Sequence, residues 1–106
     1  MLDQQLLDEI KLKLINGVHP SAIYLFGSAV NSNVYDASRS DVDLLLVQET
    51  PLPYRQRYAR ARACLRKMKI PFDVLVYTPE EVEVMKKDRS SVVSEALMKG
   101  IKIYGD

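Results

Sequence analysis

The order of apolar and polar residues along the chain predicts short strands alternating with amphipathic helices. An apolar residue recurs every three or four positions near the N-terminus, which predicts a helix over residues 3–15 that ends at Asn16-Gly17. Apolar runs predict strands at residues 22–26, 42–47 and 72–77. The second run is almost continuously apolar, which is typical of a strand that is buried on both faces. The apolar face of the first helix is formed by Leu2, Leu6, Leu7, Ile10 and Leu14.

The remaining segments predict three more helices and a last strand. The polar residues 29–40 predict a loop with room for one helical turn. A helical stripe between Pro53 and Ile70 consists of Tyr54, Tyr58, Ala61, Leu65 and Met68. Thr78-Pro79 followed by two acids is typical of a helix start. A further helix is expected over 91–99, closed by Gly100, before a strand over 101–104. This order predicts an α/β (α+β) domain, with a small mixed β-sheet flanked by helices.

Length and composition narrow the function classes. The 106 residues fit one domain, residues 1–106, and 47% hydrophobic with 27% charged residues is typical of a globular protein. The net charge of +1 does not mark a nucleic-acid binder, so direct nucleic-acid binding is not expected. One cysteine excludes an internal disulfide, and one histidine with it cannot build a structural zinc site. No apolar run approaches the roughly 20 residues that span a membrane, so we expect a reduced, cytoplasmic protein.

Three acids stand at the entrances of two predicted strands. Asp41 and Asp43 are two residues apart, so their side chains share one face of the strand. The second and third predicted strands are joined by a helix, which favours a parallel pair and would bring Asp73 beside them. If the first strand runs antiparallel to the second, its end at Gly27-Ser28 faces the same three carboxylates.

This juxtaposition indicates a divalent metal site next to a phosphate site. Crowded carboxylates resist simultaneous ionisation, and a hard cation such as magnesium relieves their repulsion while keeping open positions for water and phosphate. Two magnesium ions roughly 3.5–4 Å apart can clamp the attacking and leaving oxygens of a phosphoryl displacement. Gly27 permits close approach of the backbone to a phosphate, and the Ser28 hydroxyl can donate to it.

These residues resemble the nucleotidyltransferase superfamily that includes DNA polymerase β. The family pattern is an apolar strand ending in G-S, a spacer, D-x-D, and a third acid on a later strand. "LFGS", "SDVDLLLV" and "FDVLVYTPEE" match it in order, and "EALMKGIKIYGD" is similar to the C-terminal segment of the small stand-alone members, the minimal nucleotidyltransferases.

The resemblance implies a role for each matching residue. Asp41 and Asp43 would ligate both metal ions, and Asp73 would hold the catalytic ion and help to deprotonate the attacking hydroxyl. Gly27 and Ser28 would bind the β- and γ-phosphates. The implied reaction transfers a nucleoside monophosphate, AMP by analogy, from ATP or another NTP to a hydroxyl group and releases pyrophosphate.

One departure from the family pattern leaves two functions open. Small members commonly read G-S-R-A-R-G, whereas this chain reads "GSAVNS" and lacks both arginines, which hold phosphate oxygens with paired hydrogen bonds. Arg39, in the longer loop, is the candidate replacement. The chain is therefore either a working nucleotidyltransferase or a module of the same fold that neutralises its partner by contact.

The implied partner is a helical protein. Minimal nucleotidyltransferases typically pair with a HEPN-type protein, often a toxin with RNase activity, and serve as its antitoxin. The expected helix between Pro53 and Ile70 is rich in Arg and Lys, with Arg55, Arg62, Arg66 and Lys69 in one stripe. We interpret this stripe as a solvated surface, with docking of an acidic partner or RNA as the alternative. His19 and Cys64 are expected to be a loop residue and a helix packing residue, and Tyr54 and Tyr58 core residues rather than a base-stacking platform.

Overall fold

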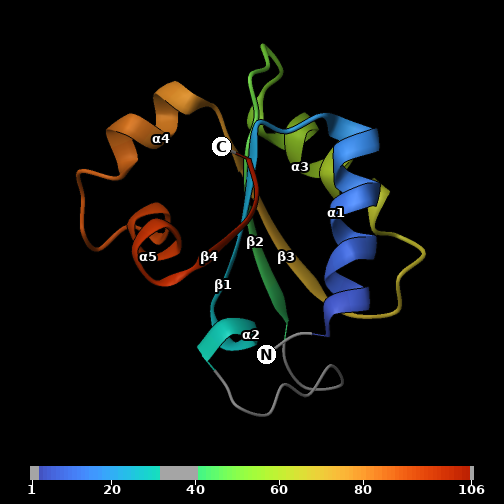
Figure 1. The fold of residues 1–106 in the computed structure, drawn as a ribbon. Helices are drawn as coiled ribbons and strands as arrows, with labels where there is room; N and C mark the ends of the chain where they lie inside the picture. The colour runs from blue at the N-terminus through green and yellow to red at the C-terminus, as the bar shows by residue number, and fades with distance from the viewer. Residues whose placement is uncertain (1–2, 32–40, 106) are drawn as a thin grey trace.

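The fold consists of one four-stranded sheet with helices on both faces (Figure 1). The structure, a computed structural model, describes residues 3–31 and 41–105. Within these ranges no helix combines the length and the apolar character needed to cross a membrane. The elements in chain order are α1 (Gln4–Val18), β1 (Ala22–Phe26), α2 (Ser28–Asn31), β2 (Val42–Val47), α3 (Tyr54–Cys64), β3 (Phe72–Tyr77), α4 (Pro79–Met85), α5 (Val92–Lys99) and β4 (Ile101–Tyr104).

The sheet is mixed, as the sequence predicted. Its strand order is β3-β2-β1-β4, so β3 and β4 form its two edges. β2 and β3 are parallel, with Asp43 opposite Asp73, and the chain crosses between them through α3. β1 is antiparallel to β2, with Phe26 opposite Asp43, and β4 is antiparallel to β1.

Two hydrophobic clusters hold the helices to the sheet. α1 and α3 cover one face, and α4 and α5 lie on the other (Figure 1). Alternate residues of β2 serve the two clusters, since Leu44 and Leu46 pack toward α1 and α3 while Leu45 and Val47 pack toward α4 and α5. The prediction that this strand is buried on both faces is therefore confirmed.

The predicted end of the first helix is wrong. α1 continues through Asn16-Gly17 to Val18, and His19, in the left-handed conformation with φ 49°, caps it by donating its backbone N–H to the carbonyl of Ile15. Gly17 is needed for contact rather than for a turn, because a Cβ there would overlap with the sulfur of Cys64 on α3. Sequence reasoning mistook a close-packing glycine for a terminating one.

The predicted apolar stripe of α3 is partly wrong. Tyr54 is 38% exposed, whereas Arg57, which belongs to the basic set, is buried together with Ala61 and Leu65. The helix also ends at Cys64, before the stripe does. Tyr54 instead lies on the ring of Tyr77 of β3, with 5.5 Å between ring centroids.

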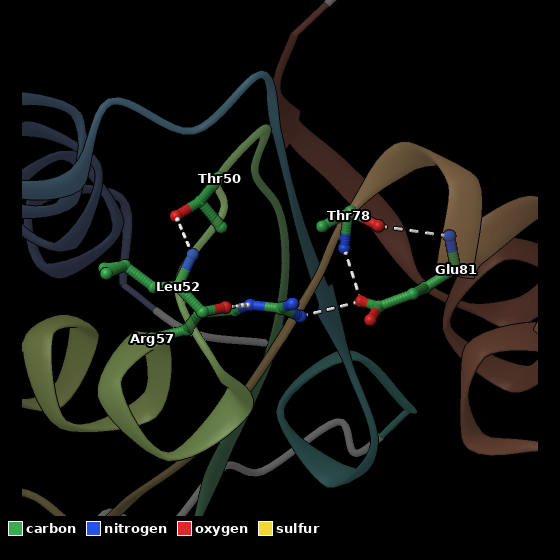
Figure 2. A network of polar contacts seen from close by, with 5 residues as sticks. All are labelled: Thr50, Leu52, Arg57, Thr78 and Glu81. Carbon is green, nitrogen blue, oxygen red and sulfur yellow. Dashed lines mark hydrogen bonds and ion pairs between the residues drawn. The ribbon is translucent and has the colours of Figure 1, made fainter.

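A polar network explains how Arg57 is accommodated (Figure 2). Its Nε donates to the carbonyl of Leu52 at 2.7 Å, and its Nη1 donates to Oε1 of Glu81 at 2.7 Å. The same Glu81 oxygen accepts the backbone N–H of Thr78 at 2.8 Å, and the Thr78 hydroxyl accepts the Glu81 N–H, which completes a capping box. Because a buried charge is costly without a partner, this network both permits burial of Arg57 and ties α3 to α4.

The helix starts predicted on the opposite face are confirmed. Thr78 is the N-cap of α4, with Pro79 at its first position. Ser91 is the N-cap of α5 and accepts the backbone N–H of Ser94, and Gly100 follows the helix as its C-cap. Gly100 lies against the carbonyl of Leu25, so the end of α5 is held close to the end of β1.

Candidate active site

The turn at the end of β1 depends on glycine. Gly27 has φ +75°, which side chains disfavour, and a Cβ there would overlap with a carboxylate oxygen of Asp43. Ser28 then begins the short helix α2 and is exposed, and the N–H of Val30 donates back to the carbonyl of Gly27 at 3.1 Å. The backbone of this turn therefore lies directly against a carboxylate of the neighbouring strand.

The three predicted aspartates lie at one end of the sheet and share a face. Asp43 and Asp73 are opposite each other in the parallel pair of β2 and β3, as predicted. Leu45 and Leu75, two residues further along each strand, pack in the cluster beneath α4 and α5, so both acids project toward that side. Asp41 precedes β2 by one residue and is exposed, as is Asp73, whereas Asp43 is half-buried. The site therefore opens to solvent.

Asp43 is the electrostatic centre of this group. Burial, followed by the charges of Asp73, Asp41 and Glu95, raises the pKa of Asp43 to about 6. An elevated pKa in a solvent-open group of like charges is typical of a functional site, although structural clusters produce it as well.

Sequence reasoning missed Glu95, an exposed residue in the first turn of α5. Glu95 precedes Gly100, and Gly100 lies against the end of β1. The charge of Glu95 is therefore near enough to act on Asp43. The surrounding sequence, "EALMKG", predicts only a helix that ends at Gly100 and carries no sign that Glu95 lies near Asp43.

The donor set suits a hard cation, although the described residues do not form a complete metal cage. Over residues 3–31 and 41–105, no group of three or more His, Cys, Asp or Glu side chains is arranged to hold a metal ion. The fit rests on chemistry, because carboxylate oxygens that repel one another are the ligands magnesium accepts, with water and phosphate completing its shell. Burial first, and then repulsion among these acids, raises the pKa of Asp43, and a bound cation would relieve the repulsion.

The residues that follow the Gly-Ser turn contribute to the hydrophobic core. Ala29, at the position where small family members have their first arginine, is fully buried in the core cluster beneath α1 and α3. Val30 packs against the same cluster. The proposed replacement, Arg39, lies outside the residues that the structure describes.

Two residues considered for chemistry have structural positions, as expected. His19 is the exposed C-cap of α1. The Cys64 thiol donates to the carbonyl of Arg60 at 3.3 Å, and burial raises its pKa, which disfavours a nucleophilic thiolate.

Comparison with known proteins places this geometry in a family. The family model described as "Nucleotidyltransferase domain" matches residues 5–103. Comparison with curated proteins gave no match.

Solved structures share the fold. A chain of a toxin–antitoxin crystal structure with AMP-PNP superposes with a TM-score of 0.66 at 18% identity, covering 94% of this chain and 73% of that one. A chain of the toxin–antitoxin MntA–HepT gives 0.58 at 20% identity, with coverages of 97% and 74%. A chain of the complex between a tri-AMPylated HEPN toxin of Shewanella oneidensis and MNT antitoxin gives 0.57 at 21% identity, with coverages of 98% and 74%.

Proposed function

Because the chain belongs to the nucleotidyltransferase domain family, we propose that it transfers AMP from ATP to a hydroxyl group of a partner protein, with magnesium as cofactor. The observation that carries this proposal is the alignment of Asp43 with Asp73 on adjacent parallel strands, with the Gly27 turn packed against the Asp43 carboxylate. Carboxylates and a close backbone turn at one solvent-open sheet edge are what a metal-bound triphosphate requires.

Each residue has a proposed role. Asp41, Asp43 and Asp73 would have to draw closer together to hold the metal, which when bound would neutralise phosphate charge and polarise the reacting phosphoryl group. Gly27 gives the β- and γ-phosphates access to the backbone, and the exposed Ser28 hydroxyl donates to them. The partner hydroxyl forms a new bond to the α-phosphorus as the bond to the β-phosphate oxygen breaks. Its proton passes to Asp73, and pyrophosphate leaves.

The proposed partner is a helical HEPN-type protein, for which this chain would act as antitoxin. Support comes from structures of the same fold, which are described as toxin–antitoxin complexes, one of them with an AMPylated HEPN toxin. AMP-PNP in a further such structure supports ATP as the donor.

Burial of Ala29 favours a second candidate function. Ala29, a core residue, occupies the position at which an arginine would bind phosphate, so we expect weaker binding of the triphosphate. The chain would then neutralise its partner by binding alone.

Labelling of the partner separates the two functions. The chain is incubated with α-³²P-ATP, magnesium and a HEPN-type protein from the same genome, and the Asp43→Asn and Asp73→Asn variants are compared with Asp8→Asn, an exposed carboxylate on α1. Transfer predicts label on the partner with the unaltered chain and with Asp8→Asn, and at least a hundredfold less with either site variant. A stable complex without label refutes the transfer proposal and supports neutralisation by contact.

A further inference from the structure

The outer surface of α3 carries positive charge that forms no ion pair with another described residue. Every charged residue between 53 and 70 is Arg or Lys. Only Arg57 turns inward, to Glu81, and in the described part of the chain this is the ion pair that α3 makes. Arg62 rests on the ring of Tyr58, 5.6 Å from its centroid, and remains exposed. The outward-facing charges are thus available to a partner.

Two arginines at the C-terminal end of α3 border a hollow whose accessible lining is mostly polar. Arg62 lies in the last turn of α3, and Arg66 lies just beyond the end of the helix at Cys64. Together with Met68, Ile70 and Phe72 they line a hollow of about 230 Å³. We call these five residues the α3 hollow. Its size suits one side chain of a partner, with guanidinium groups at the rim to receive carboxylates.

The α3 hollow lies beside the candidate active site. Phe72 is the first residue of β3, and Asp73, the next residue, projects to the opposite face of the sheet. β3 is an edge strand, so no further strand separates the two faces there (Figure 1). Successive strand residues are about 3.3 Å apart, so a protein resting on the hollow has Asp73 within reach around the edge.

We propose that the α3 hollow docks an acidic face of the acceptor protein, which places the acceptor hydroxyl beside Asp73. This inference rests on the function proposed above. A side chain of the acceptor enters the hollow, and carboxylates of the acceptor meet Arg62 and Arg66. Arg, Met and aromatic residues are the types enriched in protein–protein interfaces, and opposite charge across the interface provides orientation.

Nucleic acid fits the α3 hollow less well. Phe72 is only half-exposed and packs against the core, so the hollow offers no free ring on which a base could stack. The net charge of +1 gives little long-range attraction to a phosphate backbone.

Charge reversal tests the docking surface against a matched control. Binding of a HEPN-type protein from the same genome is measured by calorimetry at 50 and 300 mM NaCl for the unaltered chain, for Arg62→Glu/Arg66→Glu and for Arg60→Glu/Lys67→Glu. The control pair carries the same charge change but does not line the hollow. Arg60 lies on the α1 side of the helix, where Cys64, one turn later, approaches Gly17. The melting temperature of each variant shows whether it folds, and the thermal shift with magnesium and AMP-PNP shows whether its nucleotide site is intact. If Arg62→Glu/Arg66→Glu does not fold, Arg62→Gln/Arg66→Gln replaces it.

The proposal expects the hollow variant to bind at least tenfold more weakly than the unaltered chain at 50 mM NaCl and the control less than threefold more weakly, with nucleotide response unchanged. Unaltered binding by the hollow variant, or equal losses in both variants, overturns the docking surface while leaving the proposed function standing. Absence of binding by the unaltered chain overturns the proposed partner and the docking surface together. Salt-sensitive binding of a labelled RNA 12-mer that only the hollow variant loses overturns protein docking in favour of nucleic acid.

Discussion

Replacement of Asp43 by Asn should stabilise the metal-free protein at neutral pH. The folded protein holds the Asp43 proton more tightly than the unfolded chain, since its pKa is raised from 3.8 to about 6. Stability is therefore lost as pH rises from about 4 to 6, and the full penalty is present above that window. Asn has the same shape without the charge and removes the penalty.

The size of the gain follows from the shift and the exposure of the site. A shift of about two units corresponds to roughly 3 kcal/mol, and solvent screening of this half-buried group reduces it to about 1–1.5 kcal/mol. For a domain of this size that amounts to an increase in melting temperature of roughly 5 °C.

Calorimetric melting between pH 4 and 8 in EDTA provides the assay. The difference between Asp43→Asn and the unaltered chain should grow from near zero at pH 4 to its full value by pH 7. Asp8→Asn, an exposed carboxylate on α1, serves as control and should show no such growth. Magnesium should then stabilise the unaltered chain and not Asp43→Asn. A destabilised Asp43→Asn, or a difference that does not vary with pH, would refute the reasoning.

Four further outcomes follow from the same structure. Asp73→Asn removes the larger of the neighbouring charges acting on Asp43, so carboxyl NMR should show the pKa of Asp43 lower than about 6; an unchanged value would contradict the proximity of the two acids. Gly27→Ala should cost at least about 1–2 kcal/mol in urea unfolding, because of its left-handed backbone and the overlap with Asp43; a neutral change would contradict the turn geometry. Glu81→Gln should lower the free energy of unfolding by about 1–2 kcal/mol at pH 7, since it leaves the buried Arg57 without its charge partner. This value includes a reduction for solvent screening, because the Glu81 side chain is 42% exposed. Burial acts to raise the pKa of Glu81, but the backbone N–H of Thr78 and then the Arg57 guanidinium outweigh it, so the pKa is lowered. The loss should therefore shrink as pH falls below 4.5, and equal stability at pH 7 would count against the network. Magnesium with AMP-PNP at a hundredfold excess over the dissociation constant should stabilise the unaltered chain by about 2.7 kcal/mol, and no shift at millimolar ligand would argue against a working phosphate site.

The sequence alone was enough to predict the strands, two helix starts and the pairing of Asp43 with Asp73. Apolar runs predict the strands at 22–26, 42–47 and 72–77. Thr78 and Ser91 predict the starts of their helices, because an N-cap bonds only to residues close to it in the sequence. The order of strands and the connecting helix were enough to predict that Asp43 and Asp73 would be neighbours, since parallel strands begin at the same end of a sheet. The roles of these residues in metal and phosphate binding remain predictions.

Only the tertiary structure decided which side chains are buried and which charges meet. Arg57 is inside and Tyr54 outside because Glu81, distant in the sequence, supplies a charge partner for a buried guanidinium. Gly17 lies within a helix instead of ending it, and its missing side chain leaves room for the Cys64 sulfur on α3. Glu95 acts on Asp43 because the Gly100 turn holds α5 against the end of β1. Local pattern cannot show these contacts, since burial and electrostatics depend on neighbours in space rather than in sequence.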